Sequence, residues 1–161
     1  MINKQPKGGT KTMYKSKVDE AVACFDDRYN CAQAILSTYC EEFGLDKETA
    51  LKVACGMGAG MGRLQDTCGA VSGAYLLIGL MHGKHTKDGD PAKEKTYALV
   101  QEFAKRFEER NKTTNCGELL GVDLINGDKQ EIADRVAKVC RKMVRDSAEI
   151  VEQMFFSKES N

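Results

Sequence analysis

The sequence predicts an all-α protein, a single-domain bundle of about five to six helices with a glycine-rich connector. Apolar residues recur three and four positions apart along most of the chain, and no segment shows the alternation typical of a strand. Only two residues are proline. The 161 residues, 42% of them hydrophobic, suffice for one core.

We expect the helical domain to span residues 18–156, between a flexible polar leader at 1–17 and a frayed tail at 157–161. The leader carries lysines but lacks the apolar run of a secretory signal. The most apolar stretch, 70–81, is shorter than the about 20 residues of a membrane span. These features predict a cytoplasmic protein that does not bind a membrane.

Charge also limits the partners. Lys and Arg together number 24, and so do Asp and Glu, so the net charge is zero. Without a strong positive field we expect no nucleic-acid partner. A homo-oligomer is left open.

The first three helices are predicted from apolar stripes and from residues typical of helix ends. One apolar stripe covers residues 18–25, and a second covers 35–43 and ends at Gly44, a residue typical of helix C-termini. Asp46 is the expected N-cap of a third helix that reaches Ala54.

A fourth helix is expected from an N-cap at Asp66 or Thr67 to about Met81. It is apolar nearly all round, which predicts a place in the centre of the bundle. Gly69 and Gly73 lie four residues apart and would let a neighbouring helix approach closely.

The remaining chain predicts two long helices with a short turn between them. Asp90 as N-cap and Pro91 at the first helical position begin a fifth helix. The turn "NCGELLG" at 115–121 follows it, and the last helix runs from about Asp128 past Met154.

The segment "ACGMGAGMGRLQDTCGAVSGA" (54–74) carries a run of glycines between Cys55 and Cys68. Walker and Rossmann loops need a preceding strand, which the pattern does not provide, and the Lys-Ser/Thr ending is absent. A tight connector that brings Cys55 and Cys68 together is the favoured interpretation. Arg63 is either solvated or holds an anion or a thiolate.

Three cysteines share a local setting, because Cys31, Cys68 and Cys116 each follow an Asn or Thr that could cap a helix. In a first helical turn, free amides and the helix dipole would lower the thiol pKa. The alternative is that the pairs recur by chance and that the first helix runs straight through Asn30. Cys140, within an apolar stripe, is either a core thiol or the fourth corner of a buried site.

The other candidate residues are expected to have simpler roles. Cys24 and Cys40 suit packing, and Cys55 is intermediate because it adjoins the glycine run. The chain has no C-x-x-C motif. His82 and His85 form H-x-x-H in a polar loop, where a solvated pair is favoured over a metal site.

Four segments together resemble the C-GCAxxG-C-C family of redox-active proteins: "NCAQAIL" (30–36), "GMGAGMGRLQDTCGAVSGA" (56–74), "NCGELLG" (115–121) and "VCRKMV" (139–144). The resemblance implies that the family's four cysteines correspond to Cys31, Cys68, Cys116 and Cys140. One departure is that Thr67 and Gly69 flank the second cysteine, where the family motif has glycine and alanine. The resemblance implies thiol or metal-centred redox work and names no substrate.

Three functions are left open. As a thiol-dependent oxidoreductase, the protein would use Cys68 to attack and Cys31, Cys116 or Cys140 to resolve, with an unidentified redox partner or small-molecule electron donor or acceptor. Alternatively, the same four cysteines would ligate an iron–sulfur cluster or zinc. A purely structural bundle is the third. Four cysteines allow three disulfide pairings, so no connectivity is predicted.

Overall fold

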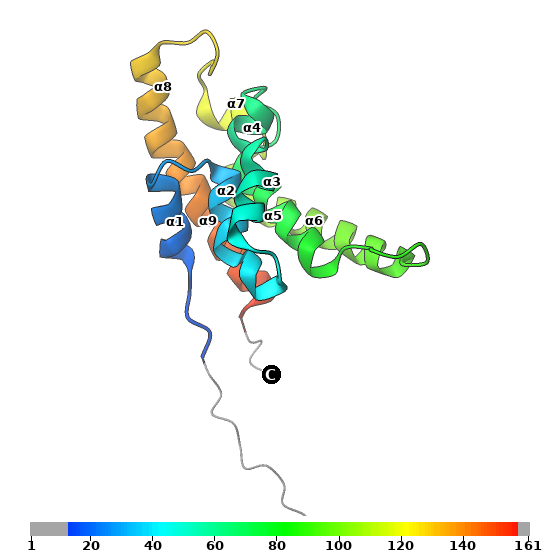
Figure 1. Cartoon of the computed structure of the whole chain (residues 1–161). Coiled ribbons are helices and arrows are strands. Elements are labelled where there is room, and N and C mark those ends of the chain that lie inside the picture. The colour runs from blue at the N-terminus through cyan, green and yellow to red at the C-terminus, as the bar shows by residue number, and fades with distance from the viewer. Residues whose placement is uncertain (1–12, 158–161) are drawn as a thin grey trace, which may run out of the picture.

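The computed structural model describes residues 13–157, and these residues confirm the all-α prediction (Figure 1). Within them, the only strand-type pairing is a single antiparallel bridge between Thr67 and Asn115. In chain order the helices are α1 (Val18–Asp26), α2 (Cys31–Tyr39), the 3-10 turn η1 (Cys40–Phe43), α3 (Lys47–Cys55), α4 (Gly58–Gly62), α5 (Gly69–His82), α6 (Asp90–Asn111), α7 (Cys116–Leu120), α8 (Lys129–Arg135), the π-helical turn η2 (Val136–Cys140) and α9 (Arg141–Phe155).

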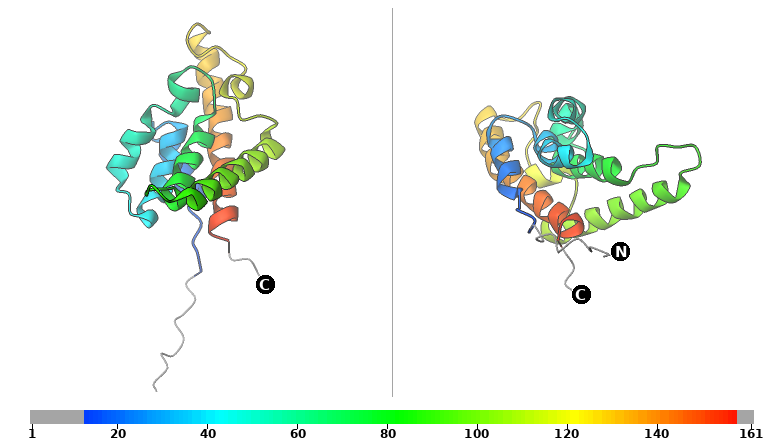
Figure 2. Two further views of the ribbon diagram at one scale, coloured as in Figure 1. Left: turned by 90° about the vertical axis from the view of Figure 1, so that its right-hand side faces the viewer. Right: turned by 60° about the horizontal axis from the view of Figure 1, so that its bottom comes forward.

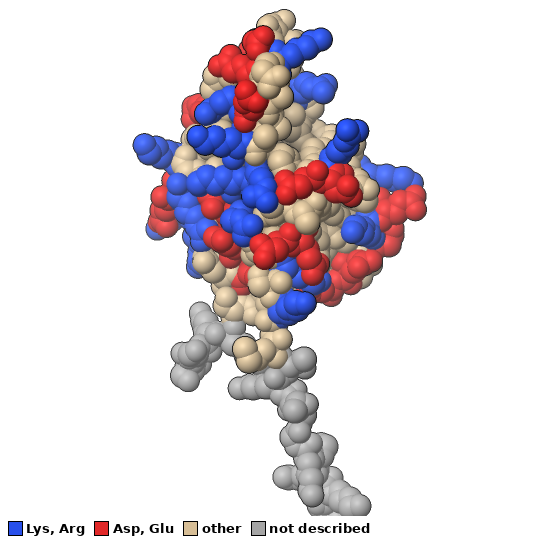
Figure 3. All heavy atoms as spheres, turned by 90° about the vertical axis from the view of Figure 1, so that its left-hand side faces the viewer, with Lys and Arg blue, Asp and Glu red and all other residues tan. Residues whose placement is uncertain are grey.

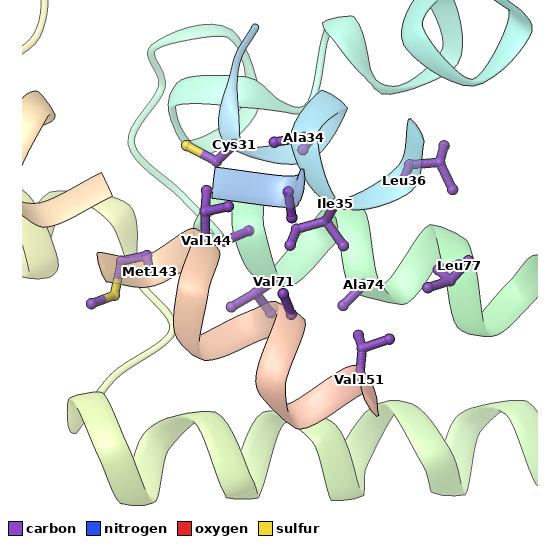
Figure 4. Close-up of a cluster of buried hydrophobic side chains, with 14 of the residues drawn as sticks. Cys31, Ala34, Ile35, Leu36, Val71, Ala74, Leu77, Met143, Val144 and Val151 are labelled. Atoms are coloured by element: carbon purple, nitrogen blue, oxygen red, sulfur yellow. The ribbon is translucent and has the colours of Figure 1, made fainter. Parts of the chain in front are cut away.

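The core lies where α2, α5 and α9 meet, and Figure 4 shows the side chains of these three helices directed at one another. Ile35, Val71 and Val144 are fully buried there. Cys31 lies at one end of this cluster. The α5–α6 hairpin extends away from α1 and α8, as Figure 1 and the right-hand view of Figure 2 show. In residues 13–157, no helix is long and apolar enough to cross a membrane.

Local capping chemistry separates α1 from α2. Arg28 takes a left-handed conformation (φ 71°) after α1. The Asn30 side chain then accepts a hydrogen bond from the Gln33 amide (3.0 Å), and the Gln33 side chain accepts one from the Asn30 amide (3.0 Å). This reciprocal capping box starts α2 at Cys31, so the predicted cap at Asn30 is confirmed and the alternative of a helix running through Asn30 is wrong.

Two other predicted caps are displaced. The N-cap of α5 is Cys68 itself, and not Asp66 or Thr67, because Thr67 is held in the bridge to Asn115. Helix α6 begins at Asp90 with Gly89 as N-cap, one residue before the predicted position. The caps at Asp46 and Asp128 and the left-handed C-cap at Gly44 are confirmed.

Helix α5 occupies the centre of the bundle, as predicted, with residues 69–74 buried in succession. The neighbour that its glycines admit is α2. A Cβ atom on Gly73 would lie 2.8 Å from the carbonyl oxygen of Ala32 and 2.9 Å from its Cα. The close approach of α2 and α5 therefore depends on the absence of a side chain at this position.

We expect Gly73→Ala to destabilise the protein by about 1–3 kcal/mol, because the methyl group would push α2 away from α5. Gly79→Ala is the matched control in the same helix, since no atom lies within 4 Å of its Cβ position. That variant should gain about 0.5–1 kcal/mol from reduced chain entropy. Urea unfolding midpoints measure both, and equal effects at the two sites would contradict the packing argument.

The ends of the described chain meet. Residues 1–12 of the predicted leader and 158–161 of the predicted tail lie outside the described residues. Tyr14 stacks on Phe156 with ring centroids 4.5 Å apart. The Lys17 amide donates to the Glu152 carboxylate (2.7 Å), which also accepts from the Tyr39 hydroxyl (2.9 Å). These contacts hold the start of α1 against the end of α9.

Candidate functional site

The four cysteines of the family pattern, Cys31, Cys68, Cys116 and Cys140, are all buried and are brought together by four different segments. Cys31 begins α2, Cys68 caps α5, Cys116 begins α7 and Cys140 ends the π-helical turn. The thiol of Cys31 interacts with that of Cys140, and it acts electrostatically on Cys68 and on Cys116. Cys31 is therefore the central thiol of the cluster.

The bridge between Thr67 and Asn115 aligns two of these segments. The Cys68 amide donates to the Thr114 carbonyl (2.8 Å), and the Cys116 amide donates to the Asp66 carbonyl (2.6 Å). Both bonds hold the backbone of a cysteine, so the pairing sets where the two thiols enter the cluster. This pairing was not predicted from the sequence. The repeated cap-and-cysteine dipeptides were its only local signal.

The glycine run is a connector, as predicted, but it has an unusual form. Residues 59–63 all have positive φ, from 57° at Ala59 to 70° at Arg63. Such a left-handed turn is costly for residues with a Cβ, by about 1–2 kcal/mol each, and the interspersed glycines reduce that cost. The turn places the Ala59 amide where it favours a thiolate on Cys31.

The connector does not act through Cys55. That cysteine is exposed at the end of α3, and its carbonyl accepts a hydrogen bond from the Asn30 side chain (2.9 Å). The thiols that act on Cys68 are instead those of Cys31 and Cys116. Cys40 is buried, and its thiol donates to the Ser37 carbonyl at 3.6 Å.

The expected lowering of thiol pKa values at helix starts is wrong for three of the cysteines. The pKa of Cys31 is raised by its hydrogen-bonding interaction with Cys140 and by burial. Burial and the nearby Cys31 raise the pKa of Cys68, and they raise that of Cys116 to about 11. The amides of Ala70 and Val71 favour the Cys68 thiolate, but burial outweighs them.

Raised thiol pKa values make stability depend on pH. Between the ordinary pKa of 9.0 and the folded value of about 11, Cys116 keeps its proton when folded and loses it when unfolded. The unfolded state therefore binds fewer protons, and the free energy of unfolding should fall as pH rises through this window. Urea midpoints on either side of the window measure the slope, which Cys116→Ser should reduce. A slope unaffected by that substitution would contradict the assignment.

A pocket of about 710 Å³ opens onto two of the four thiols, those of Cys31 and Cys140. Cys68 and Cys116 do not line it. The π-helical turn contributes Val136, Ala137 and Cys140 itself. Such turns are frequent at functional sites because the added residue displaces the helical register. Of the four buried cysteines, this pair is therefore the part of the cluster that borders the pocket.

Basic side chains surround the pocket. Arg28, Arg63, Lys129 and Arg141 line it with a single acid, Asp26. Arg141 is paired with Asp26 (3.1 Å). Figure 3 shows the face that carries α1 and α8, where Lys and Arg side chains gather around the middle. Of these cations, only Arg63 was predicted from the sequence to hold an anion or a thiolate. The spacing of the others along the chain has no regular pattern.

The four clustered cysteines are the predicted ligands of a metal site. A Cys₄ site needs four sulfurs about 2.3 Å from one ion. Within residues 13–157, no group of three or more His, Cys, Asp or Glu side chains is arranged to hold a metal ion. The described residues therefore do not offer the Cys₄ site predicted for zinc, and the iron–sulfur cluster stays a prediction. His82 ends α5 beside Phe155, at 6.0 Å between ring centroids, and neither His82 nor His85 lines the pocket.

The comparisons with known proteins agree with the cysteine pattern. Residues 29–154 match the family described as "Putative redox-active protein (C_GCAxxG_C_C)". No curated protein and no solved structure matches the chain. The matched segment includes all four cysteines of the cluster and most of the 161 residues. The chain therefore belongs to the C_GCAxxG_C_C family.

Proposed function

We propose that the protein is a thiol–disulfide redox protein whose reactive pair is Cys31 and Cys140. The observation that carries this proposal is that, of the four clustered thiols, these two line the pocket, where a disulfide substrate could reach them. The interaction between the two thiols supports their pairing.

The reaction is a two-electron exchange. We assign the attack to Cys140, because it is the more exposed of the two residues, at 9% against 6% for Cys31. The Cys140 thiolate attacks one sulfur of the substrate disulfide, that bond breaks, and the first thiolate leaves. Cys31 then gives its proton to the substrate thiolate that has left and attacks the Cys140 sulfur of the mixed disulfide, which releases the second substrate thiolate to be protonated by solvent. The products are a Cys31–Cys140 disulfide and two substrate thiols, so the substrate is reduced and the pair is oxidised.

Cys68 and Cys116 are proposed as a second pair behind the first. The attack by Cys68 predicted from the sequence stays a prediction, and its target would be the Cys31 sulfur of the oxidised pair. Cys116 would resolve the resulting Cys31–Cys68 disulfide, which returns Cys31 and Cys140 to thiols and leaves a Cys68–Cys116 disulfide. Cys31 contributes to the raised pKa of both Cys68 and Cys116, so both lie near it, as this exchange requires.

The test is disulfide mapping after anaerobic purification. Metal content and free thiols are measured first, and seven free thiols are expected. One equivalent of diamide is then added, and cysteine-containing peptides are identified by mass. A Cys31–Cys140 disulfide as the first product is the expected result. Brown protein with iron and sulfide, or a first disulfide that omits Cys31 or Cys140, would overturn the proposal.

A further inference from the structure

We infer that the pocket above Cys31 and Cys140 takes a small disulfide that carries anionic groups on an apolar body. This inference rests on the proposed redox function and names its substrate class. The pocket volume of about 710 Å³ lies within the range typical of small-molecule sites.

The charge of the pocket favours an anion. Asp26, the one acid in the lining, is paired with Arg141. The other three cations, Arg28, Arg63 and Lys129, make no ion pair with any side chain of residues 13–157. An approaching ligand therefore meets three cations without a compensating acid in the lining, and this favours negative groups.

Backbone conformation sets the two arginines apart. Arg28 (φ 71°) and Arg63 (φ 70°) both have left-handed backbone conformations at the end of a helix, where glycine would fit without a steric penalty. Neither side chain forms a salt bridge among the described residues that would offset this penalty. Their position beside the thiol pair gives the two guanidinium groups a function in binding.

The walls of the pocket are apolar. Phe25 contributes from α1, Leu120 and Leu124 from α7 and the segment that follows it, and Ile132 from α8. A ligand that fills this space buries carbon against them while its charged groups meet the cations. A fully polar anion would leave the apolar walls without a partner.

The ligand is the disulfide substrate in the proposed thiol–disulfide exchange with Cys140 and Cys31. Its sulfur–sulfur bond breaks, two anionic thiols leave, and the Cys31–Cys140 disulfide forms. Attraction by the three cations should raise the rate at which an anionic disulfide reaches Cys140, relative to a neutral one of similar size.

The experiment compares two aromatic disulfides, dithiobis(nitrobenzoate), which is anionic, and dithiodipyridine, which is neutral. The rate at which each forms the Cys31–Cys140 disulfide is measured in the full chain and in Arg28→Gly, Arg63→Gly and Lys129→Gln. Each substitution should lower the anionic rate by about threefold or more at low salt, with little change in the neutral rate. Added salt should reduce the difference.

Arg28→Gly and Arg63→Gly separate an effect on binding from an effect on folding. Each removes the backbone strain of a left-handed residue, so each should keep or raise the unfolding temperature. Lys112→Gly is the matched control, since Lys112 also has positive φ (71°) at a helix end but does not line the pocket. It should leave both rates unchanged.

Two results would overturn the inference. If both reagents form the Cys31–Cys140 disulfide and the ratio of their rates is unchanged in all three pocket variants, the anion preference is wrong and the proposed function stands. If neither reagent forms that disulfide, the proposed function fails and this inference fails with it.

Discussion

Cys31→Ser is expected to trap the mixed disulfide at Cys140. With dithiodipyridine as the substrate, the native chain should resolve the Cys140 adduct rapidly, because Cys31 lies beside it in the same pocket. A well-oriented intramolecular group reacts far faster than a free one, so the adduct lifetime should increase by at least about 100-fold without Cys31. Peptide mass analysis of the Cys140 adduct over time measures this lifetime.

Cys40→Ser is the control for Cys31→Ser, because Cys40 is also buried but does not line the pocket. Replacing either buried thiol should cost about 1–3 kcal/mol, so stability alone cannot separate the variants. The Cys40 variant should resolve the adduct at the native rate. Native-rate resolution in Cys31→Ser as well would show that another thiol resolves Cys140, which contradicts the assigned pair.

Gly60→Ala should strongly destabilise the protein. Gly60 has φ +64°, and a Cβ atom there would lie 2.6 Å from the Cys116 Cβ and 2.7 Å from the Gln65 Cα. The strain of the left-handed backbone and the clash with neighbouring backbone should together lower the free energy of unfolding by about 3 kcal/mol or more. Urea unfolding measures the loss, and the rate of Cys116 alkylation should rise as its packing is disturbed.

Gly62→Ala isolates the backbone contribution. Gly62 has nearly the same φ (+61°), but the nearest atom to its Cβ position, the Gly56 carbonyl oxygen, is 3.9 Å away. Its cost should be about 1–2 kcal/mol, from left-handed strain alone. If the two variants lose equal stability, contact between the connector and Cys116 does not contribute.

Features set by local chemistry were predictable from the sequence. The capping box at Asn30 and the left-handed Gly44 depend on residues a few positions apart, and the close approach at Gly73 follows from a missing side chain on an apolar helix. The grouping of Cys31, Cys68, Cys116 and Cys140 was anticipated by resemblance to a family, since no periodic pattern joins residues so far apart.

Features set by tertiary contact were not predictable in this way. The bridge of Thr67 to Asn115 moved the cap of α5 to Cys68. Burial reversed the expected pKa shifts, because a thiol's desolvation depends on what packs over it and not on the residue before it. The lining of the pocket likewise combines segments that sequence periodicity treats separately.

The assembly of the thiol cluster has a consequence for the newly made chain. Cys31 and Cys140 are 109 positions apart (140 − 31), and the helix that carries Cys140 comes after every other helix that contributes a cysteine to the cluster. Contacts of such long range form slowly, because the intervening chain must first lose its freedom. During synthesis the early thiols therefore exist without their final partner. The proposed Cys31–Cys140 pair forms only when the last helix docks, and until then the seven free thiols are open to pairing errors that an oxidising environment would fix in place.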